Sequence, residues 1–184
     1  MSQPAEIPGY AVGRWTVDPV HSDASFTVRH LVSKVRGRFR AIEGTITTAE
    51  NPLDSAITVS IDPSSIDTGN EQRDAHLRSA DFLEVEKYPR LTFTSTGIRQ
   101  NGDGYLVEGD LTIKDVTRSI TAELELGGFT PGPDGVPLAG FTASFEIDRK
   151  DYNVNFSAIL ETGGVVVGDT IAIQLEVEAG LDQG

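Results

Sequence analysis

The chain has 184 residues and a mass of 19.8 kDa, the size of one ordinary domain with a substantial core. Its 28 acidic and 15 basic side chains give a formal net charge of −13, a field that repels phosphate polymers and argues against nucleic acid as a partner. Cysteine is absent, which excludes disulfides, thiolate metal sites and cysteine nucleophiles.

The first residues, MSQPAEIPGYAVG, have neither the basic start nor the apolar stretch of a signal peptide. No later run of about 18 apolar residues predicts a membrane span. We therefore expect a cytoplasmic protein with a flexible segment at 1–13 and one domain at 14–180.

From there on, apolar and polar residues alternate with a period of two, which predicts strands. In DASFTVRH, residues 23–30, Phe26, Val28 and His30 share one face. Comparable stripes follow in GRFRAIEGTITT, SAITVSI, RLTFTS, YLVEGDLTIK, SITAELEL, GFTASFEI and TIAIQLEV. Turn residues separate them, as in NGDG at 101–104 and TPGPDGVP at 130–137. The pattern predicts an all-β fold of roughly eight antiparallel strands, a number that closes a sheet into a barrel.

The inward stripes of such a barrel either fill it as a core or line a pore for one small ligand, and patterning does not decide between these alternatives. The residues predicted to line the pore are Phe26, Val28, Phe39, Phe93, Leu111, Ile113, Phe141, Phe145 and Phe156.

One charged segment, residues 67–80, interrupts the strands. DTGNEQRDAHLRSA predicts a short helix with Asp67 or Thr68 as its N-cap. Apolar residues at and just beyond its end, namely Leu77, Phe82 and Leu83, would plug one open end of the barrel.

No arrangement typical of a nucleophilic enzyme or a metal site is present in the sequence. HSD at 21–23 is not a triad, because adjacent strand residues point to opposite faces. His21 and His30 have opposite parity, and no paired histidine spacing supports zinc, so no metal is expected. We predict a binding protein, and His30 or His76 as a general base inside the barrel stays open as an enzymatic alternative.

A basic ribbon stands out in this acidic chain, with Arg36, Arg38 and Arg40 on one face of RHLVSKVRGRFR. It is either a solvated outer face or a docking patch for an anionic lipid or membrane surface. Screening confines the acidic background to about 10 Å, so local docking is compatible with the net charge.

Five motifs follow one another in a familiar order: WTVDPVHSDASFTVRHL, VRGRF, SIDTGNEQRDAHLRSADFLEVEKYPRLTF, VEGDLTIKDVTRSI and DRKDYNV. Together they resemble the YceI-like family of lipid-binding proteins, from about Trp15 to Ala179. The resemblance implies a lipocalin-like barrel around a hydrophobic pore that holds a long isoprenoid chain, such as a polyprenyl phosphate or quinone. It implies no other cofactor, and a role in lipid transport, storage or stress response. A stress-related interaction domain with a filled core is the third alternative.

The resemblance also selects polar candidates. His30, Arg73, Asp74 and His76 match family motifs and would orient a head group or fix the helix, with Arg73 and Asp74 alternatively forming an ion pair. Small residues are expected to leave room for the tail: Ala24, Gly37, Ala122 and Ala143.

The family's closing motif often has Phe-Gly where this chain has Tyr152 and Asn153. Because asparagine tolerates the left-handed conformation, we expect the turn to persist. Open edge strands could pair two barrels into a homodimer, as lipocalin-like folds often do.

Overall fold

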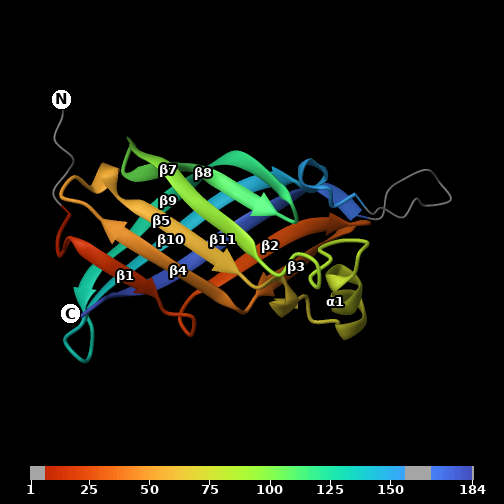
Figure 1. The fold of residues 1–184 in the computed structure, drawn as a ribbon, viewed down its shortest axis with the longest axis horizontal. Coiled ribbons are helices and arrows are strands. Elements are labelled where there is room, and N and C mark those ends of the chain that lie inside the picture. Colours follow the sequence, from red (N-terminus) through yellow and green to blue (C-terminus); the bar gives the residue numbers. More distant parts are fainter. Residues whose placement is uncertain (1–6, 156–166, 184) are drawn as a thin grey trace.

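The computed structural model describes residues 7–155 and 167–183 and shows an elongated antiparallel barrel with a short helix at one end (Figure 1). The strands are β1 Gly13–Val17, β2 Asp23–His30, β3 Ser33–Phe39, β4 Ile42–Thr48, β5 Ala56–Ile61, β6 Ile66–Asp67, β7 Leu91–Asn101, β8 Gly104–Ile113, β9 Val116–Pro131, β10 Pro137–Asp148 and β11 Val167–Leu181. The helix α1 is Glu71–Arg78, and the 3-10 turns are η1 Pro52–Asp54, η2 Pro63–Ser65 and η3 Arg149–Tyr152.

Eight strands close the barrel, in the order β1-β4-β5-β7-β8-β9-β10-β11, and pairing of β1 with β11 joins the two ends. This confirms the predicted fold class. The first half of the long strand β11 pairs with β2, and β2 continues through β3 to β6.

The described residues form eleven strands rather than the predicted eight, and three local features account for the difference. β1 lay outside the counted stripes, and β6 has only two residues. The run predicted at 37–48 divides into β3 and β4 at Arg40 and Ala41, where the chain turns from one strand pairing to another.

Alternation directs apolar residues inward and builds two core clusters. The cluster beside β1 contains Trp15, which is 1% exposed and whose indole Nε1 donates to Thr48 Oγ1 at 3.0 Å. The cluster beside α1 contains Phe82 and Tyr152. Trp15 therefore anchors the barrel at the end where β1 and β11 close it.

The helix begins later than the sequence predicted, because Asn70 is its N-cap and Asn70 Oδ1 accepts the amide of Arg73 at 2.9 Å. The prediction of Asp67 or Thr68 as the cap is wrong. Asp67 instead accepts hydrogen bonds from the Gly69 amide and the Arg40 guanidinium. These two bonds lower the pKa of the Asp67 carboxyl. Thr68 in turn binds Arg73 and Asp74, so neither predicted cap is the N-cap of the helix.

The described part of the predicted flexible segment, residues 7–13, contacts the barrel. The Tyr10 hydroxyl donates to the Ala49 carbonyl at 2.5 Å, and its ring meets Phe129 edge-on at 5.4 Å between centroids. Gly13 is already the first residue of β1. Within the described ranges, no helix has the length and apolar character needed to cross a membrane.

Candidate binding cavity

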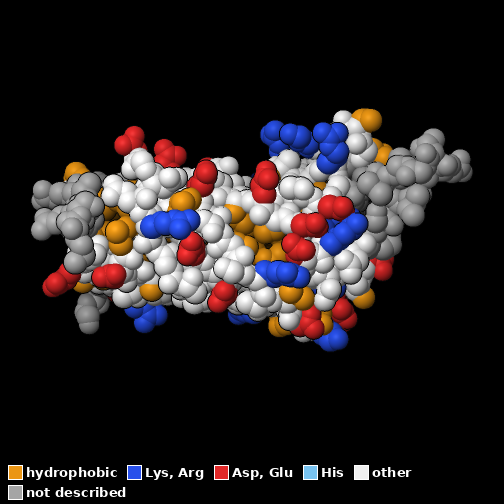
Figure 2. Space-filling view, turned by 90° about the horizontal axis from the view of Figure 1, so that it is seen from above, with side chains coloured by type: hydrophobic (Ala, Val, Ile, Leu, Met, Phe, Trp, Pro, Cys, Tyr) orange, Lys and Arg blue, Asp and Glu red, His pale blue; other side chains and the backbone are white. Residues whose placement is uncertain are grey.

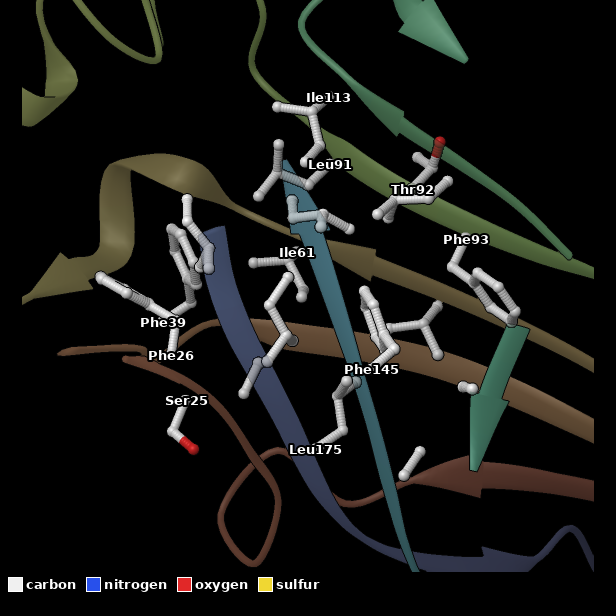
Figure 3. Close-up of a pocket in the computed structure, with 18 of the residues that line it drawn as sticks. Ser25, Phe26, Phe39, Ile61, Leu91, Thr92, Phe93, Ile113, Phe145 and Leu175 are labelled. Carbon is white, nitrogen blue, oxygen red and sulfur yellow. The ribbon is translucent and has the colours of Figure 1, made fainter. Parts of the chain in front are cut away.

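An internal cavity runs between the two core clusters, with a volume of about 190 Å³ accessible to the centre of a water molecule. Figure 3 shows side chains from several strands converging on it, among them Phe39 of β3, Leu91 of β7 and Phe145 of β10. Eight residues predicted to face the pore belong to its lining: Phe26, Val28, Phe39, Phe93, Leu111, Ile113, Phe141 and Phe145. The ninth, Phe156, lies outside the described residues.

The cavity remains open because aromatic rings fold over glycines on neighbouring strands. Phe26 lies directly across from Gly37, and a Cβ at Gly37 would stand only 2.4 Å from Phe26 Cζ. Phe93 covers Gly109 in the same way, also at 2.4 Å. Gly37 itself does not line the cavity; it makes room for the Phe26 ring, which would otherwise project further into the cavity. The predicted alanines, Ala24, Ala122 and Ala143, do line the cavity.

The helical segment supplies part of the wall. Leu77, Phe82 and Leu83 line the cavity, as the sequence predicted for residues at and beyond the helix end. Phe82 is 6% exposed, and its ring meets that of His76 edge-on at 5.1 Å. Apolar side chains are visible at the bottom of a hollow near the middle of the face in Figure 2, so the apolar interior reaches the surface there.

The turn that follows β10 carries a buried cation. Among the described residues of the lining, only Arg149 is charged, and its side chain is 2% exposed. Its guanidinium donates from Nε to the Gly168 carbonyl at 2.9 Å and from Nη1 to the Val154 carbonyl at 2.8 Å. Nη2 lies 3.7 Å from Asp169 Oδ1. Arg149 thereby ties η3 to the start of β11.

The rest of this turn follows the sequence expectation. Asn153 has φ 62° and ψ 24°, the left-handed conformation that glycine would supply, so the prediction for this position is confirmed. Tyr152 lines the cavity and is 2% exposed. Burial raises the pKa of its phenol above the ordinary value.

A second, smaller cavity of about 80 Å³ lies toward the end of the barrel that contains Trp15. Four residues belong to the lining of both cavities and form a layer between them: Ile57, Val107, Leu124 and Phe141. The two spaces therefore lie in series along the barrel.

Three of the polar candidates, Arg73, Asp74 and His76, lie on the helix and are not part of the described cavity wall. Arg73 donates from Nε to Thr68 Oγ1 at 2.7 Å, and Asp74 accepts from the Thr68 amide at 2.9 Å. These two side chains bind Thr68, with no ion pair between them, and so fix the start of α1. His76 Nε2 lies 2.8 Å from Asp81 Oδ2 on the outer side. Only the backbone of His30 is described, at the end of β2.

His21 and His76, the two histidines whose side chains are described, lie in different segments of the fold. His21 Nδ1 lies 2.7 Å from Asp18 Oδ2, near the β1 end, whereas His76 lies on α1. Among the described residues, no group of three or more His, Asp or Glu side chains is arranged to hold an ion.

The basic ribbon begins on the outer face of β3 with Arg36 and Arg38 and continues to Arg40 just past the strand, and all three are exposed. Val35, Gly37 and Phe39 alternate with them and face inward. Arg40 Nη2 pairs with Asp67 Oδ2 at 2.7 Å. The ribbon therefore lies apart from the cavity.

The family model for the YceI-like domain matches residues 15–179. The chain belongs to the YceI-like family. A UPF0312 protein of Staphylococcus epidermidis is 40% identical over 172 residues, covering 92% of this YceI-like chain and 98% of the relative.

Solved structures share the barrel of this YceI-like protein. The Campylobacter jejuni YceI protein has a TM-score of 0.71 and 30% identity, over 84% of this chain and 90% of that one. A polyisoprenoid binding domain from Saccharophagus degradans has a TM-score of 0.69 over 94% and 100% of the two chains. At 17% identity, this second likeness supports the fold alone.

Sequence reasoning missed Arg149 and Tyr152 as parts of the cavity wall. Both lie in the motif DRKDYNV, which was considered only for its turn. Their burial arises from the packing of η3 against β9, β10 and β11, which are distant in sequence or separated from it by a long connection, so the motif alone does not reveal it.

Proposed function

We propose that this protein binds an isoprenoid-type lipid by enclosing its hydrocarbon tail within the barrel. The observation that carries the proposal is the chemistry of the cavity wall, which is apolar apart from Arg149 and a few small hydroxyl side chains. Polyprenyl phosphates and isoprenoid quinones combine a long apolar tail with a compact polar head. The S. degradans domain, which shares only its fold with this chain, is described as a polyisoprenoid binding domain, and the isoprenoid class in our proposal is taken from that description.

The energetics require a long tail. Burying one methylene gains about 0.8 kcal/mol, whereas association costs about 4–15 kcal/mol. At about 0.8 kcal/mol per methylene, burying a tail of about 15 carbons gains about 12 kcal/mol. This gain exceeds an association cost of about 10 kcal/mol, the middle of the range given above. We therefore expect isoprenoids of fewer carbons to bind weakly.

The size of the cavity bears on how such a tail is accommodated. A cavity of about 150 Å³ lined by Leu, Ile and Phe is enough to bind benzene. The 190 Å³ of the larger space thus takes a short segment of tail without rearrangement. A longer tail would continue toward the second cavity once the Phe141 side chain turns out of the layer between the two.

The polar head would remain at the α1 end of the barrel. His30 and His76 both belong to elements at that end and are the proposed contacts of the head group. Arg73 and Asp74 would not contact the head group. Their hydrogen bonds to Thr68 hold the helix over the cavity. On this proposal the protein is a cytoplasmic carrier or store that takes part in lipid transport or a stress response, and not an enzyme.

The first test is native mass spectrometry of the purified protein, followed by organic extraction and analysis of the released lipid. We expect a stoichiometric isoprenoid adduct, or one formed on incubation with polyprenyl phosphate or quinone. A bare mass that persists after both incubations would overturn the proposal.

A pair of variants assigns the binding to the cavity. Ala143 lines the cavity on β10, whereas Ala172 is exposed on β11. Ala143→Leu inserts three carbons into the cavity and should weaken tail binding at least tenfold, whereas Ala172→Leu should leave it unchanged. Equal affinities for both variants would place the ligand elsewhere.

A further inference from the structure

The hairpin between β2 and β3 ends in two exposed apolar residues. Val32 is 98% exposed and Leu31 is 43% exposed. Leu31 also has φ 55°, a left-handed conformation that is strained for a residue with a bulky side chain. Glycine or asparagine would form such a turn more easily and would be more soluble. Neither the turn nor solubility accounts for these two residues.

Basic side chains surround this apolar tip. Arg29 and Lys34 are direct cross-strand partners, and Arg36 follows on the same outward face of β3. All three are exposed, and across the described part of the chain none of them forms an ion pair. Like charges that face each other across two strands destabilise the pairing. The hairpin thus concentrates positive charge in a protein whose net charge is −13.

The tip lies beside the cavity. Val28, three positions before Leu31, lines the cavity and pairs with Val35 across the hairpin. Figure 1 places β2 and β3 next to α1, at the same end of the barrel. A surface bound by the tip would therefore face the end of the cavity that carries the helix.

We propose that the β2–β3 hairpin docks this protein on an anionic lipid bilayer. Leu31 and Val32 enter the interfacial region, and Arg29, Lys34 and Arg36 contact the lipid phosphates. An exposed apolar pair beside cations matches a surface that offers hydrocarbon beneath negative charge, which a nucleic acid does not. The docking goes beyond the proposed function, because it does not depend on what the cavity holds.

Salt should control the docking. The acidic remainder of the protein is repelled by the same bilayer, but at 0.1 M salt this repulsion is screened beyond about 10 Å. The phosphate contacts of the hairpin act at shorter range and weaken further as salt rises. Binding is therefore expected at low and moderate ionic strength and to fall steeply above it.

Co-sedimentation with vesicles tests the charge. The vesicles are phosphatidylglycerol mixed with phosphatidylcholine, or phosphatidylcholine alone. Replacing three cations at about 1 kcal/mol each, as in Arg29→Gln, Lys34→Gln and Arg36→Gln together, should lower partition into anionic vesicles on the order of 100-fold. The control removes three exposed arginines away from the hairpin, Arg14 on β1, Arg90 just before β7 and Arg99 on β7, through Arg14→Gln, Arg90→Gln and Arg99→Gln. It should lower partition by less than about fivefold, the effect of one cation at the surface.

Fluorescence tests the apolar contact. Val32→Trp should be quenched by brominated phosphatidylglycerol vesicles, whereas Val20→Trp, 83% exposed beyond the other end of β2, should not. Trp15 is 1% exposed and gives both variants the same background.

Four results would overturn the docking proposal. They are absence of binding by the native chain to anionic vesicles at low salt, equal losses in the two triple variants, an unquenched Trp at position 32, and tighter binding to heparin than to vesicles. Circular dichroism of each variant verifies the fold, so that a lost signal is not misassigned.

Discussion

Replacing Gly37 by alanine should disturb both the stability of the barrel and its cavity. A Cβ at this position would lie 2.4 Å from Cζ and 2.8 Å from Cε1 of Phe26, and 2.9 Å from Thr68 Cγ2. The ring must therefore move, and the direction open to it is into the cavity. Overpacking of this kind costs about 1–3 kcal/mol, and the lower end applies because a ring tip moves more easily than backbone. A loss of about 1 kcal/mol lowers Tm by about 2–4 °C in a chain of this size.

Urea unfolding of four proteins gives the answer: the native chain, Gly37→Ala, Phe26→Leu and the double variant. The double variant should recover most of the cost of the glycine change, with a coupling energy of at least about 0.5 kcal/mol. Gly97→Ala is the matched control, since no atom lies within 4 Å of its added Cβ, and it should be neutral or slightly stabilising. Strict additivity of the Phe26 and Gly37 changes would refute the ring-over-glycine arrangement.

Three further outcomes follow from the structure. NMR titration should show a raised pKa for His21, because its imidazolium donates a hydrogen bond to the Asp18 carboxylate and is attracted by that carboxylate and by Glu178. The resulting stabilisation is complete below the ordinary value of 6.5 and is lost as pH rises through the raised pKa. Asp18→Asn should reduce it to the part that Glu178 supplies. Asn153→Ala should lower the free energy of unfolding by about 1 kcal/mol and Asn153→Gly should not, because only alanine is strained at φ 62°. Arg149→Met should cost about 2–5 kcal/mol in urea unfolding, since two buried carbonyls lose their donor, whereas Lys150→Met on the surface should change it by less than about 1 kcal/mol.

The alternation of apolar and polar residues predicted the barrel, because successive residues of a strand point to opposite faces of the sheet. Phe26 and Val28 face inward and Arg36 and Arg38 face outward, as their parity in the sequence requires. The helix was also predictable from its break in this pattern. The N-cap of the helix could not be predicted, because Asp67, Thr68 and Asn70 are all residues that cap helices well. Asp67 is excluded only because β6, to which it belongs, pairs with β3.

Whether the barrel is filled or hollow could not be predicted. That outcome depends on which residues face each other across strands, and the pairing of Phe26 with Gly37 cannot be seen in either strand alone. The Leu31 and Val32 tip escaped notice for a related reason. Two apolar residues after an alternating run suggest that the strand continues. They are exposed because the chain turns directly after His30, the last residue of β2.

The closure of the barrel by β1 and β11 also sets the order of events during synthesis. Trp15 pairs with Leu181, so the contact that seals the cylinder joins residues from opposite ends of the chain. A ribosome must release the chain as far as Leu181 before this pairing can form. Contacts so distant in sequence slow folding, and until the last strand arrives the growing sheet presents unpaired edges on both sides. The step that completes the cavity is thus also the step that pairs the open edges of β1 and β10, through β11.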